Sequence, residues 1–398
     1  PIGSRGLGDV YKRQTNTAMG RLALCKNTTG GSNTAIGSTA LFNNTTASYN
    51  TAVGVGALDA TTTGHTNTSI GYYSTLSNTT GCCNVALGAC ALYTNTTGCY
   101  NVAIGMNALA ANTTGVDNTA VGCGSLTTNT TASANTALGR AALRLNTTGD
   151  DNVALGRNAM CANTTASNNV SIGHEAMCTN TTGANNTAVG KSALRSNTTG
   201  ASNTAVGFSA LKANTTASGN VAMGQESLTT NTTGSALTAI GTNAMYANTT
   251  GTSNVALGHS SLESNTTADS NTAIGRSALS NNTTGASNVS VGAFSMNDNT
   301  TGHSNTAVGR GSLDANTTAV SNTAIGFCAM TTTTTGGDNT AVGECAMKAN
   351  TTGANHTAVG RRALSTNTTA AENTAVGVEA LRLNTTGSCN TAVGVSAL

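Results

Sequence analysis

Aliphatic residues recur at two fixed positions of a 17-residue unit along almost the whole chain. In the copy Asn33 to Tyr49, Ile36 at position 4 and Leu41 at position 9 are the large apolar residues. Small residues occupy positions 3 and 8, and Asn-Thr-Thr occupies positions 12 to 14. From Asn16 the unit returns in twenty-two full copies and a nine-residue stub that ends at Leu398. A fixed period without insertions predicts one structural unit per copy, stacked on its neighbours.

The unit predicts short strands rather than helices. Position 5 is Gly in every copy, from Gly20 to Gly394, and the unit is rich in β-branched residues and Asn, which all disfavour a helix. An invariant Gly indicates a positive φ, or no room for Cβ, at the end of a strand. We predict an all-β fold, a parallel β-solenoid with 17-residue coils, in which about 23 coils are spaced by about 4.8 Å. Residues 16–398 form one array, and residues 1–15 are interpreted as a cap or, preferably, as foreign sequence.

Charged residues indicate which positions are covered. From Asn16 onward every Asp, Glu, Lys and Arg lies at positions 6, 7, 10, 11, 16 or 17. Positions 1 to 5 are never charged, so both faces of the strand are predicted to be buried, as in an interior strand. One face would line the thin core of the coil. The other, a flat surface of the small residues at positions 3 and 8, would pack on another chain, which favours a homo-oligomer because one coil buries little aliphatic surface.

Composition disfavours several classes of function. Only 8% of residues are charged, the net charge is +2 and aromatic residues are 3%, which disfavours charge-driven disorder and a basic nucleic-acid surface. No apolar run approaches the roughly 18–20 residues of a membrane helix, and residues 1–15 lack the apolar segment of a signal peptide. Paired carboxylates and the motifs of phosphate loops, zinc proteases and serine hydrolases are absent. We expect no enzyme, no cofactor and no membrane insertion.

The repeated segment NTAVGxxAL resembles the A-[IV]-G-xx-A head repeats of trimeric autotransporter adhesins. The whole unit, NTAVGxxALxxNTTGxx, is similar to repeats of tail-fibre-like proteins, and the resemblance covers residues 16–398. It implies a parallel β-roll, trimerisation around the apolar faces, and a role in surface adhesion or as a fibre shaft. The head repeats of that family have shorter coils of about fourteen to fifteen residues.

Asn-Thr-Thr at positions 12 to 14 is an N-x-T sequon in twenty of the twenty-two full copies, and Thr61 and Thr333 replace Asn in the other two. If position 12 faces solvent, each coil can carry a glycan, and the fibre of a secretory eukaryote would be sugar-coated. If it faces inward, the amides form an Asn ladder that leaves no room for sugar. The candidate glycosylation sites are Asn27, Asn44, Asn78, Asn95, Asn112, Asn129, Asn146, Asn163, Asn180, Asn197, Asn214, Asn231, Asn248, Asn265, Asn282, Asn299, Asn316, Asn350, Asn367 and Asn384.

Three pairs of cysteines lie one period apart. A spacing of about 4.8 Å between equivalent Cα atoms falls inside the disulfide window of about 4.4–6.8 Å, although parallel Cβ vectors would strain the bond. Coil-to-coil disulfides in an oxidising compartment are therefore one interpretation. The alternative is that the cysteines are small surface residues, as we expect for Cys25, Cys123 and Cys389. The candidate pairs are Cys82 with Cys99, Cys161 with Cys178, and Cys328 with Cys345.

Regular threonines indicate a further alternative, an ice-binding face. Such a face generally needs two ordered columns of Thr, whereas the adjacent threonines at positions 13 and 14 would point in opposite directions in a strand. The leading prediction is therefore a structural, extracellular, homo-oligomeric fibre subunit, with or without a glycan coat. An adhesin or tail-fibre-like receptor-binding shaft is the second hypothesis, and an ice-binding β-solenoid is the third.

Overall fold

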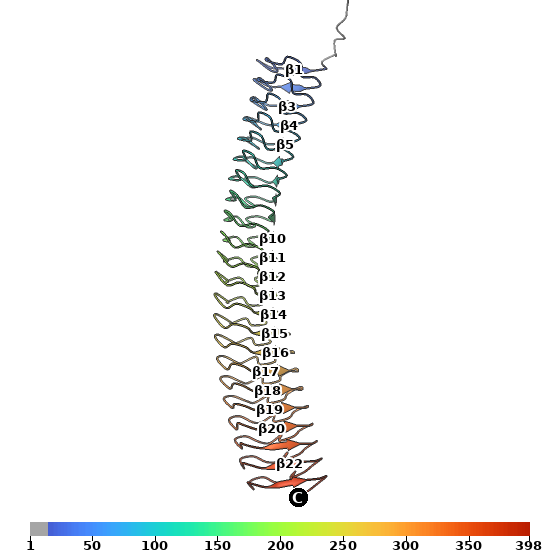
Figure 1. The fold of residues 1–398 in the computed structure, drawn as a ribbon, viewed down its shortest axis with the longest axis vertical. Helices are drawn as coiled ribbons and strands as arrows, with labels where there is room; N and C mark the ends of the chain where they lie inside the picture. The colour runs from blue at the N-terminus through green and yellow to red at the C-terminus, as the bar shows by residue number, and fades with distance from the viewer. Residues whose placement is uncertain (1–14) are drawn as a thin grey trace, which may run out of the picture. The chain divides into compact units, whose positions relative to one another are not determined.

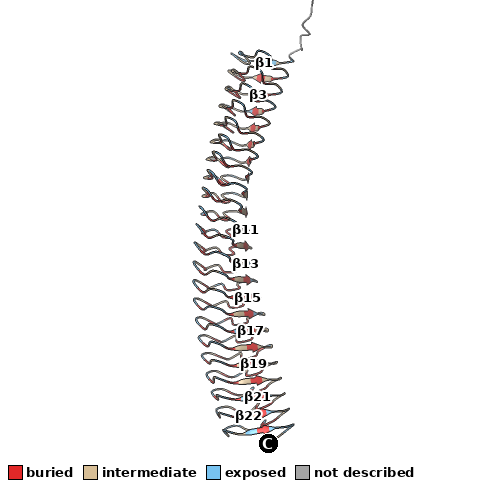
Figure 2. Ribbon diagram, viewed as in Figure 1, coloured by how far each residue is buried: buried red, intermediate tan, exposed pale blue. Residues whose placement is uncertain are grey.

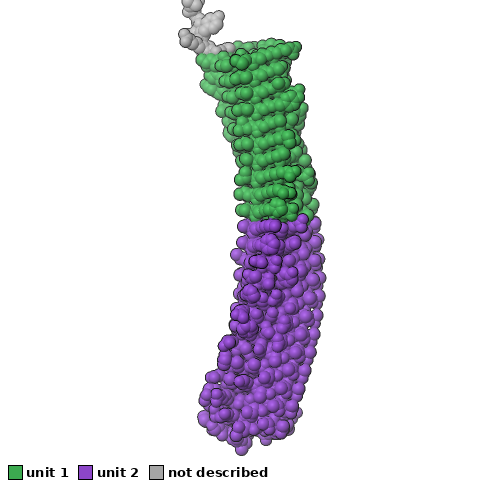
Figure 3. All heavy atoms as spheres, turned by 180° about the vertical axis from the view of Figure 1, so that it is seen from behind, with its two compact units in different colours: residues 1–184 green, residues 185–398 purple. Residues whose placement is uncertain are grey.

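The computed structural model describes residues 15–398. They divide into two compact units, one ending at Ala184 and the other spanning Asn185–Leu398 (Figure 3). Each unit is a stack of 17-residue coils with one three-residue strand per coil, and the described residues contain no helix (Figure 1). The prediction of a parallel β-solenoid is therefore confirmed. The predicted leader, residues 1–15, lies outside the described residues except for Thr15.

The strands are identical in length and occupy positions 2 to 4 of every copy. The first unit contains Thr17–Met19 (β1), Thr34–Ile36 (β2), Thr51–Val53 (β3), Thr68–Ile70 (β4), Val85–Leu87 (β5), Val102–Ile104 (β6), Thr119–Val121 (β7), Thr136–Leu138 (β8), Val153–Leu155 (β9) and Val170–Ile172 (β10). The second unit contains Thr187–Val189 (β11), Thr204–Val206 (β12), Val221–Met223 (β13), Thr238–Ile240 (β14), Val255–Leu257 (β15), Thr272–Ile274 (β16), Val289–Val291 (β17), Thr306–Val308 (β18), Thr323–Ile325 (β19), Thr340–Val342 (β20), Thr357–Val359 (β21), Thr374–Val376 (β22) and Thr391–Val393 (β23).

Within each unit, successive strands pair in parallel and in register, so each residue faces its equivalent 17 residues later. The turns between the strands continue this pairing from coil to coil. The N–H of Leu41 donates to the carbonyl of Ala57 at 3.0 Å, and the N–H of Asn43 donates to the carbonyl of Asp59 at 2.9 Å. Most of the coil is therefore turn backbone whose hydrogen bonds run along the stack, which satisfies buried backbone groups without long strands.

The invariant Gly at position 5 ends each strand. Gly190 has φ +133°, and a Cβ on it would lie 2.4 Å from the carbonyl oxygen of Gly207 in the next coil. Both predicted reasons for the glycine therefore apply, a backbone conformation that L side chains rarely adopt and the lack of space for a side chain.

Other positive φ angles occur at positions that the sequence did not mark. Positions 7, 9 and 17 are left-handed throughout the described coils, as at Thr39 (φ 55°), Leu41 (φ 51°) and Tyr49 (φ 62°). A non-Gly residue in this region costs about 1–2 kcal/mol. Burial of the position 9 side chain and the hydrogen bonds to the next coil must offset this cost.

The core of the coil is narrower than the sequence suggested. Position 3 and position 8 alanines, such as Ala35 and Ala40, are fully buried and pack with the position 9 leucine, Leu41. The middle residue of each inner strand is accordingly buried, and its neighbours at positions 2 and 4 are not (Figure 2). The predicted outward surface of small residues at positions 3 and 8 is therefore wrong: these residues line the interior, because only small side chains fit beside the position 9 leucine.

Candidate functional site

The outward face of the strands is the first candidate interaction surface. We call it the strand face and define it as the residues at positions 2 and 4 of each strand, Thr or Val at position 2 and Val, Ile, Leu or Met at position 4. No position 4 side chain from Met19 to Val393 is buried, and Ile240 and Ile274 are 40% and 37% exposed. Nevertheless no strand carries a charge on this face, although charged residues are present at the neighbouring variable positions. The strand face is therefore an unbroken apolar and hydroxyl surface within each unit.

The asparagines at position 12 point into the coil. The side chain of Asn112 is fully buried, and its Nδ2 donates to Asn95 Oδ1 at 2.8 Å and to the carbonyl of Gly115 at 3.0 Å. Its Oδ1 accepts from Nδ2 of Asn129 at 3.0 Å. The same pattern connects the position 12 asparagines of consecutive coils, so of the two arrangements considered from the sequence the structure contains the amide ladder.

This ladder bears directly on the twenty candidate glycosylation sites. An N-linked sugar replaces one hydrogen of Nδ2, and in Asn112 both Nδ2 hydrogens already donate inside the coil. A sugar at such a buried position would break a ladder bond and needs space that the closely packed coil lacks. Glycosylation of position 12 stays a prediction, and it requires the coil to open locally or to be modified before it folds.

A second ladder, formed by position 1, was not foreseen. Asn33 Nδ2 donates to the carbonyl of Ala47 at 2.9 Å, and its Oδ1 accepts from the backbone N–H of Asn50 at 3.0 Å. Because Asn44 Nδ2 also donates to the carbonyl of Ala47, both ladders share the carbonyl of position 15. The signal was in the sequence, since position 1 is Asn in every copy except two.

The two exceptions in the position 1 ladder differ in chemistry. His356 replaces the amide with its ring: Nε2 lies 2.6 Å from the carbonyl of Ala370, and Nδ1 accepts from the N–H of Asn373 at 3.1 Å. This pairing requires the neutral ring with its proton on Nε2, and desolvation by burial lowers the pKa of His356. The backbone N–H of Leu237 donates to Asn220 Oδ1, but its side chain has no amide with which to continue the ladder.

Two of the three predicted cysteine pairs are in contact. The sulfur atoms of Cys82 and Cys99 lie 3.0 Å apart, and those of Cys161 and Cys178 lie 2.9 Å apart. None of these four sulfur atoms is part of a disulfide in this structure. The hydrogen bond with Cys99 raises the pKa of Cys82 to about 12, whereas the hydrogen bond from Cys178 lowers the pKa of Cys161 to about 7.

The third predicted cysteine pair is not brought together. Cys328 and Cys345 are free and half-buried, and no sulfur contact joins them in the described structure. Cys25, Cys123 and Cys389 are exposed, as expected for surface residues. Across residues 15–398, no group of three or more His, Cys, Asp or Glu side chains is arranged to hold a metal ion.

The threonines of the sequon lie in different environments. Thr45 at position 13 donates its hydroxyl to the carbonyl of Thr62 in the next coil at 3.1 Å, and this bond recurs along both units. Thr46 at position 14 is exposed, as is its equivalent in each of the twenty-two full copies. Position 14 never carries a charge and is nevertheless uncovered, and within each unit it forms a single exposed column of hydroxyl groups.

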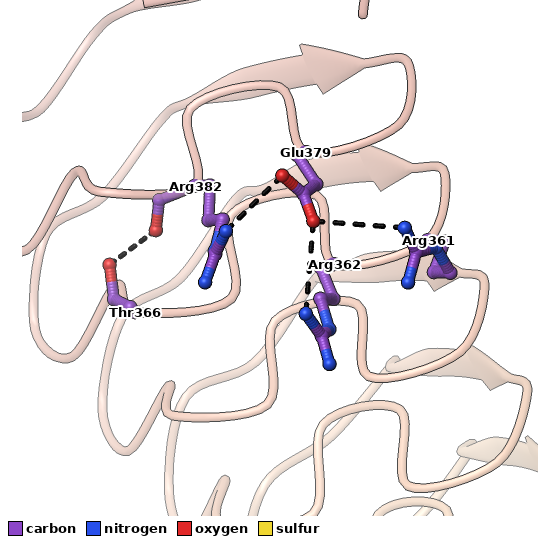
Figure 4. A network of polar contacts seen from close by, with 5 residues as sticks. All are labelled: Arg361, Arg362, Thr366, Glu379 and Arg382. Carbon is purple, nitrogen blue, oxygen red and sulfur yellow. Dashed lines mark hydrogen bonds and ion pairs between the residues drawn. The ribbon is translucent and has the colours of Figure 1, made fainter. Parts of the chain in front are cut away.

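Charged side chains meet on the turns that contain positions 6, 7 and 10. We call this surface the turn face. In the second unit Glu379 lies among three arginines, with carboxylate-to-guanidinium distances of 3.7 Å to Arg361, 3.8 Å to Arg362 and 3.2 Å to Arg382 (Figure 4). Ion pairs this exposed contribute little stability. They show, however, that side chains at positions 6, 7 and 10 of adjacent coils converge on one point.

Comparison with known proteins gives no family for this chain. No family model matches it, and no curated protein matches it. In the part of the chain that the structure describes, no helix has the length and apolar character needed to cross a membrane. The resemblance to adhesin head repeats and tail-fibre-like repeats therefore stays a prediction.

Proposed function

We propose that the chain is a non-enzymatic structural subunit of an extracellular fibre, in which copies of the same chain pack through their strand faces. The observation that carries the proposal is the strand face itself. Its aliphatic side chains at position 4 are partly exposed in every coil, and no copy replaces any of them with a charged residue. A long solvent-exposed strand surface of this composition normally marks an interaction surface.

A second copy is the occupant that fits this surface best. Each strand presents about 50 Å², from three residues at about 3.3 Å each and a coil spacing of about 4.8 Å. The ten strands of the first unit then present about 500 Å² and the thirteen of the second about 650 Å². The second unit alone therefore reaches the lower end of the roughly 600–1,000 Å² per partner of a standard interface. A copy also has the same 17-residue spacing, so each aliphatic residue would meet an equivalent one.

The buried amides bear on whether the proposed fibre carries glycans. With position 12 inside the coil, the exterior at the sequon consists of threonine hydroxyls rather than asparagine amides. We therefore propose a fibre without glycans at position 12. An adhesin or tail-fibre-like shaft would use the same assembly and would add a receptor-binding region.

Charge on the strand face tests the proposal. Ile240→Lys with Ile274→Lys would place two ammonium groups where copies pack, and we expect it to convert the assembly into single chains of 39.1 kDa in light scattering. The matched control is Ala247→Lys with Asn281→Lys at position 11, where Lys26 occurs naturally. Circular dichroism would verify that both variants fold. A wild-type chain that is monomeric at all concentrations, or equal masses for both variants, would contradict the proposal.

Ice binding is the weaker candidate. The exposed column at position 14 favours it, because equivalent hydroxyls repeat at about 4.8 Å. A second column is missing beside it, since the position 13 hydroxyls bond to the next coil and Val interrupts the Thr residues of position 2. A thermal-hysteresis assay tests this candidate, and zero activity would eliminate it.

A further inference from the structure

An arginine-rich hollow lies on the turn face of the first unit. Arg140, Arg144 and Arg157 line it together with Asn158 and Cys161, and its volume is about 370 Å³. The coils concerned carry β8 and β9. The residues occupy positions 6, 7 and 10, so they are not part of the strand face.

The three arginines lack the acidic partner that the equivalent cluster possesses. In the second unit Glu379, at position 7, lies between three arginines and neutralises part of their charge. In the hollow, position 7 is Ala141 in one coil and Asn158 in the next. Among residues 15–398, no ion pair within 4.0 Å joins Arg140, Arg144 or Arg157 to a carboxylate. No acidic residue lines the hollow either.

The donors in this hollow have the chemistry of an anion site. Each guanidinium presents a planar fork of N–H groups that suits two oxygens of one oxoanion, and the Asn158 amide adds a neutral donor. Three positive charges around a hollow whose lining contains no acidic residue repel one another, so an anion between them is favoured over water. We propose that the hollow defined by Arg140, Arg144 and Arg157 binds a sulfate or phosphate group, either as a free ion or as an ester on a carbohydrate.

The thiol of Cys161, which lines the hollow, determines the pH at which binding should be measured. The hydrogen bond from Cys178, together with the nearby charge of Arg144, lowers the pKa of Cys161 to about 7, and Glu175 acts against this. A deprotonated Cys161 would compete with the anion for the same positive field. Binding is therefore measured at pH 6, where the thiol is mostly protonated.

The experiment is equilibrium dialysis of radiolabelled inorganic sulfate against the full chain, with ionic strength held constant by chloride. We expect one saturable site, and we expect Arg144→Gln with Arg157→Gln to weaken it at least about tenfold. Asn158→Glu should abolish the site because it supplies the carboxylate that Glu379 supplies elsewhere. Position 7 accepts Glu in the left-handed conformation, as Glu379 and Glu175 show, so this variant should fold.

The reciprocal substitution provides the matched control. Glu379→Asn leaves Arg361, Arg362 and Arg382 without their carboxylate, and we expect it to add a second saturable sulfate site. Tighter binding of a sulfated disaccharide than of inorganic sulfate would assign the site to a carbohydrate ester, and equal affinity would assign it to the free ion. The proposal is overturned if the wild-type chain shows no saturable uptake, or if Asn158→Glu binds sulfate as the wild-type chain does.

Discussion

Removing one amide from the position 12 ladder should open the stack locally. Asn112→Ala deletes the two bonds that Asn112 Nδ2 donates, at 2.8 Å and 3.0 Å, and the bond that its Oδ1 accepts from Asn129. Asn129 Nδ2 keeps its bond to the carbonyl of Ala132, and the Gly115 carbonyl keeps the bond from Asn101, so Asn95 Oδ1 is the group left in most need of a partner. A buried polar atom without its partner costs about 1–3 kcal/mol, and the cavity adds to this. We expect a local loss of about 2–4 kcal/mol.

Hydrogen exchange is the appropriate assay, because a stack of repeats opens in parts rather than in one step. The amide of Thr113 donates to the carbonyl of Thr130, so peptides covering this coil should exchange about 30- to 800-fold faster in Asn112→Ala. Asn281→Ala, which removes an exposed amide bonded to Asp298, should change exchange little. Asn112→Thr should be intermediate, because Thr61 occupies an equivalent position naturally. Unchanged protection in Asn112→Ala would refute the structural role of the ladder.

Three further outcomes follow from other contacts. Gly190→Val should lower the melting temperature and reduce protection from hydrogen exchange in its own coil, because a Cβ at this position meets the carbonyl oxygen of Gly207 at 2.4 Å. An unchanged melting temperature would contradict the turn assignment. The pKa of His356 is lower in the folded state than in the unfolded state, so the stability that neutral His356 contributes is fully present above about pH 6.5 and is lost as the pH falls below that value. His356→Asn should remove this pH dependence, measured as the denaturant concentration at the unfolding midpoint. Mild oxidation should join Cys161 to Cys178 in a disulfide, measured as a mass loss of about two hydrogens. The pair Cys161 and Cys178 should react faster than the pair Cys82 and Cys99, because Cys161 has the lower pKa and thiolate is the attacking species. Equal oxidation rates for the two pairs would contradict this pKa difference.

The period and the glycine were sufficient to predict the architecture. Seventeen-residue spacing and an invariant Gly at position 5 predicted coils that stack in parallel and in register. The structure has these coils, and the glycine has a positive φ in each of them. These features are readable from sequence because each imposes the same constraint on every copy. The left-handed residues at positions 7, 9 and 17 were not predicted, because many residue types occupy positions 7 and 17 and Leu at position 9 has no known preference for positive φ.

The direction in which side chains point was the part that sequence did not determine. Residues at positions 3 and 4 point to opposite sides of the strand, and neither is ever charged, so patterning left two choices. Size suggested that Ile36 at position 4 was internal, yet Ala35 is the buried residue because the coil is too thin for a second large side chain. The sequon had the same ambiguity: Asn at a solvent-facing turn and Asn in an internal ladder have identical sequence patterns.

Methionine oxidation tests the central claim most directly, namely that position 4 faces outward and is covered by a copy of the chain. Met223 at position 4 is 40% exposed in the single chain, Met106 on the turn face is 54% exposed, and Met245 at position 9 is fully buried. After brief treatment with peroxide, peptide mass spectrometry should find Met106 oxidised and Met245 protected in every state. Met223 should be protected in the assembled wild-type protein and oxidised as readily as Met106 in the dissociated Ile240→Lys, Ile274→Lys variant. Protection of Met223 in single chains would place position 4 in the core and contradict the account, and so would oxidation of Met223 in the assembly at the rate of Met106.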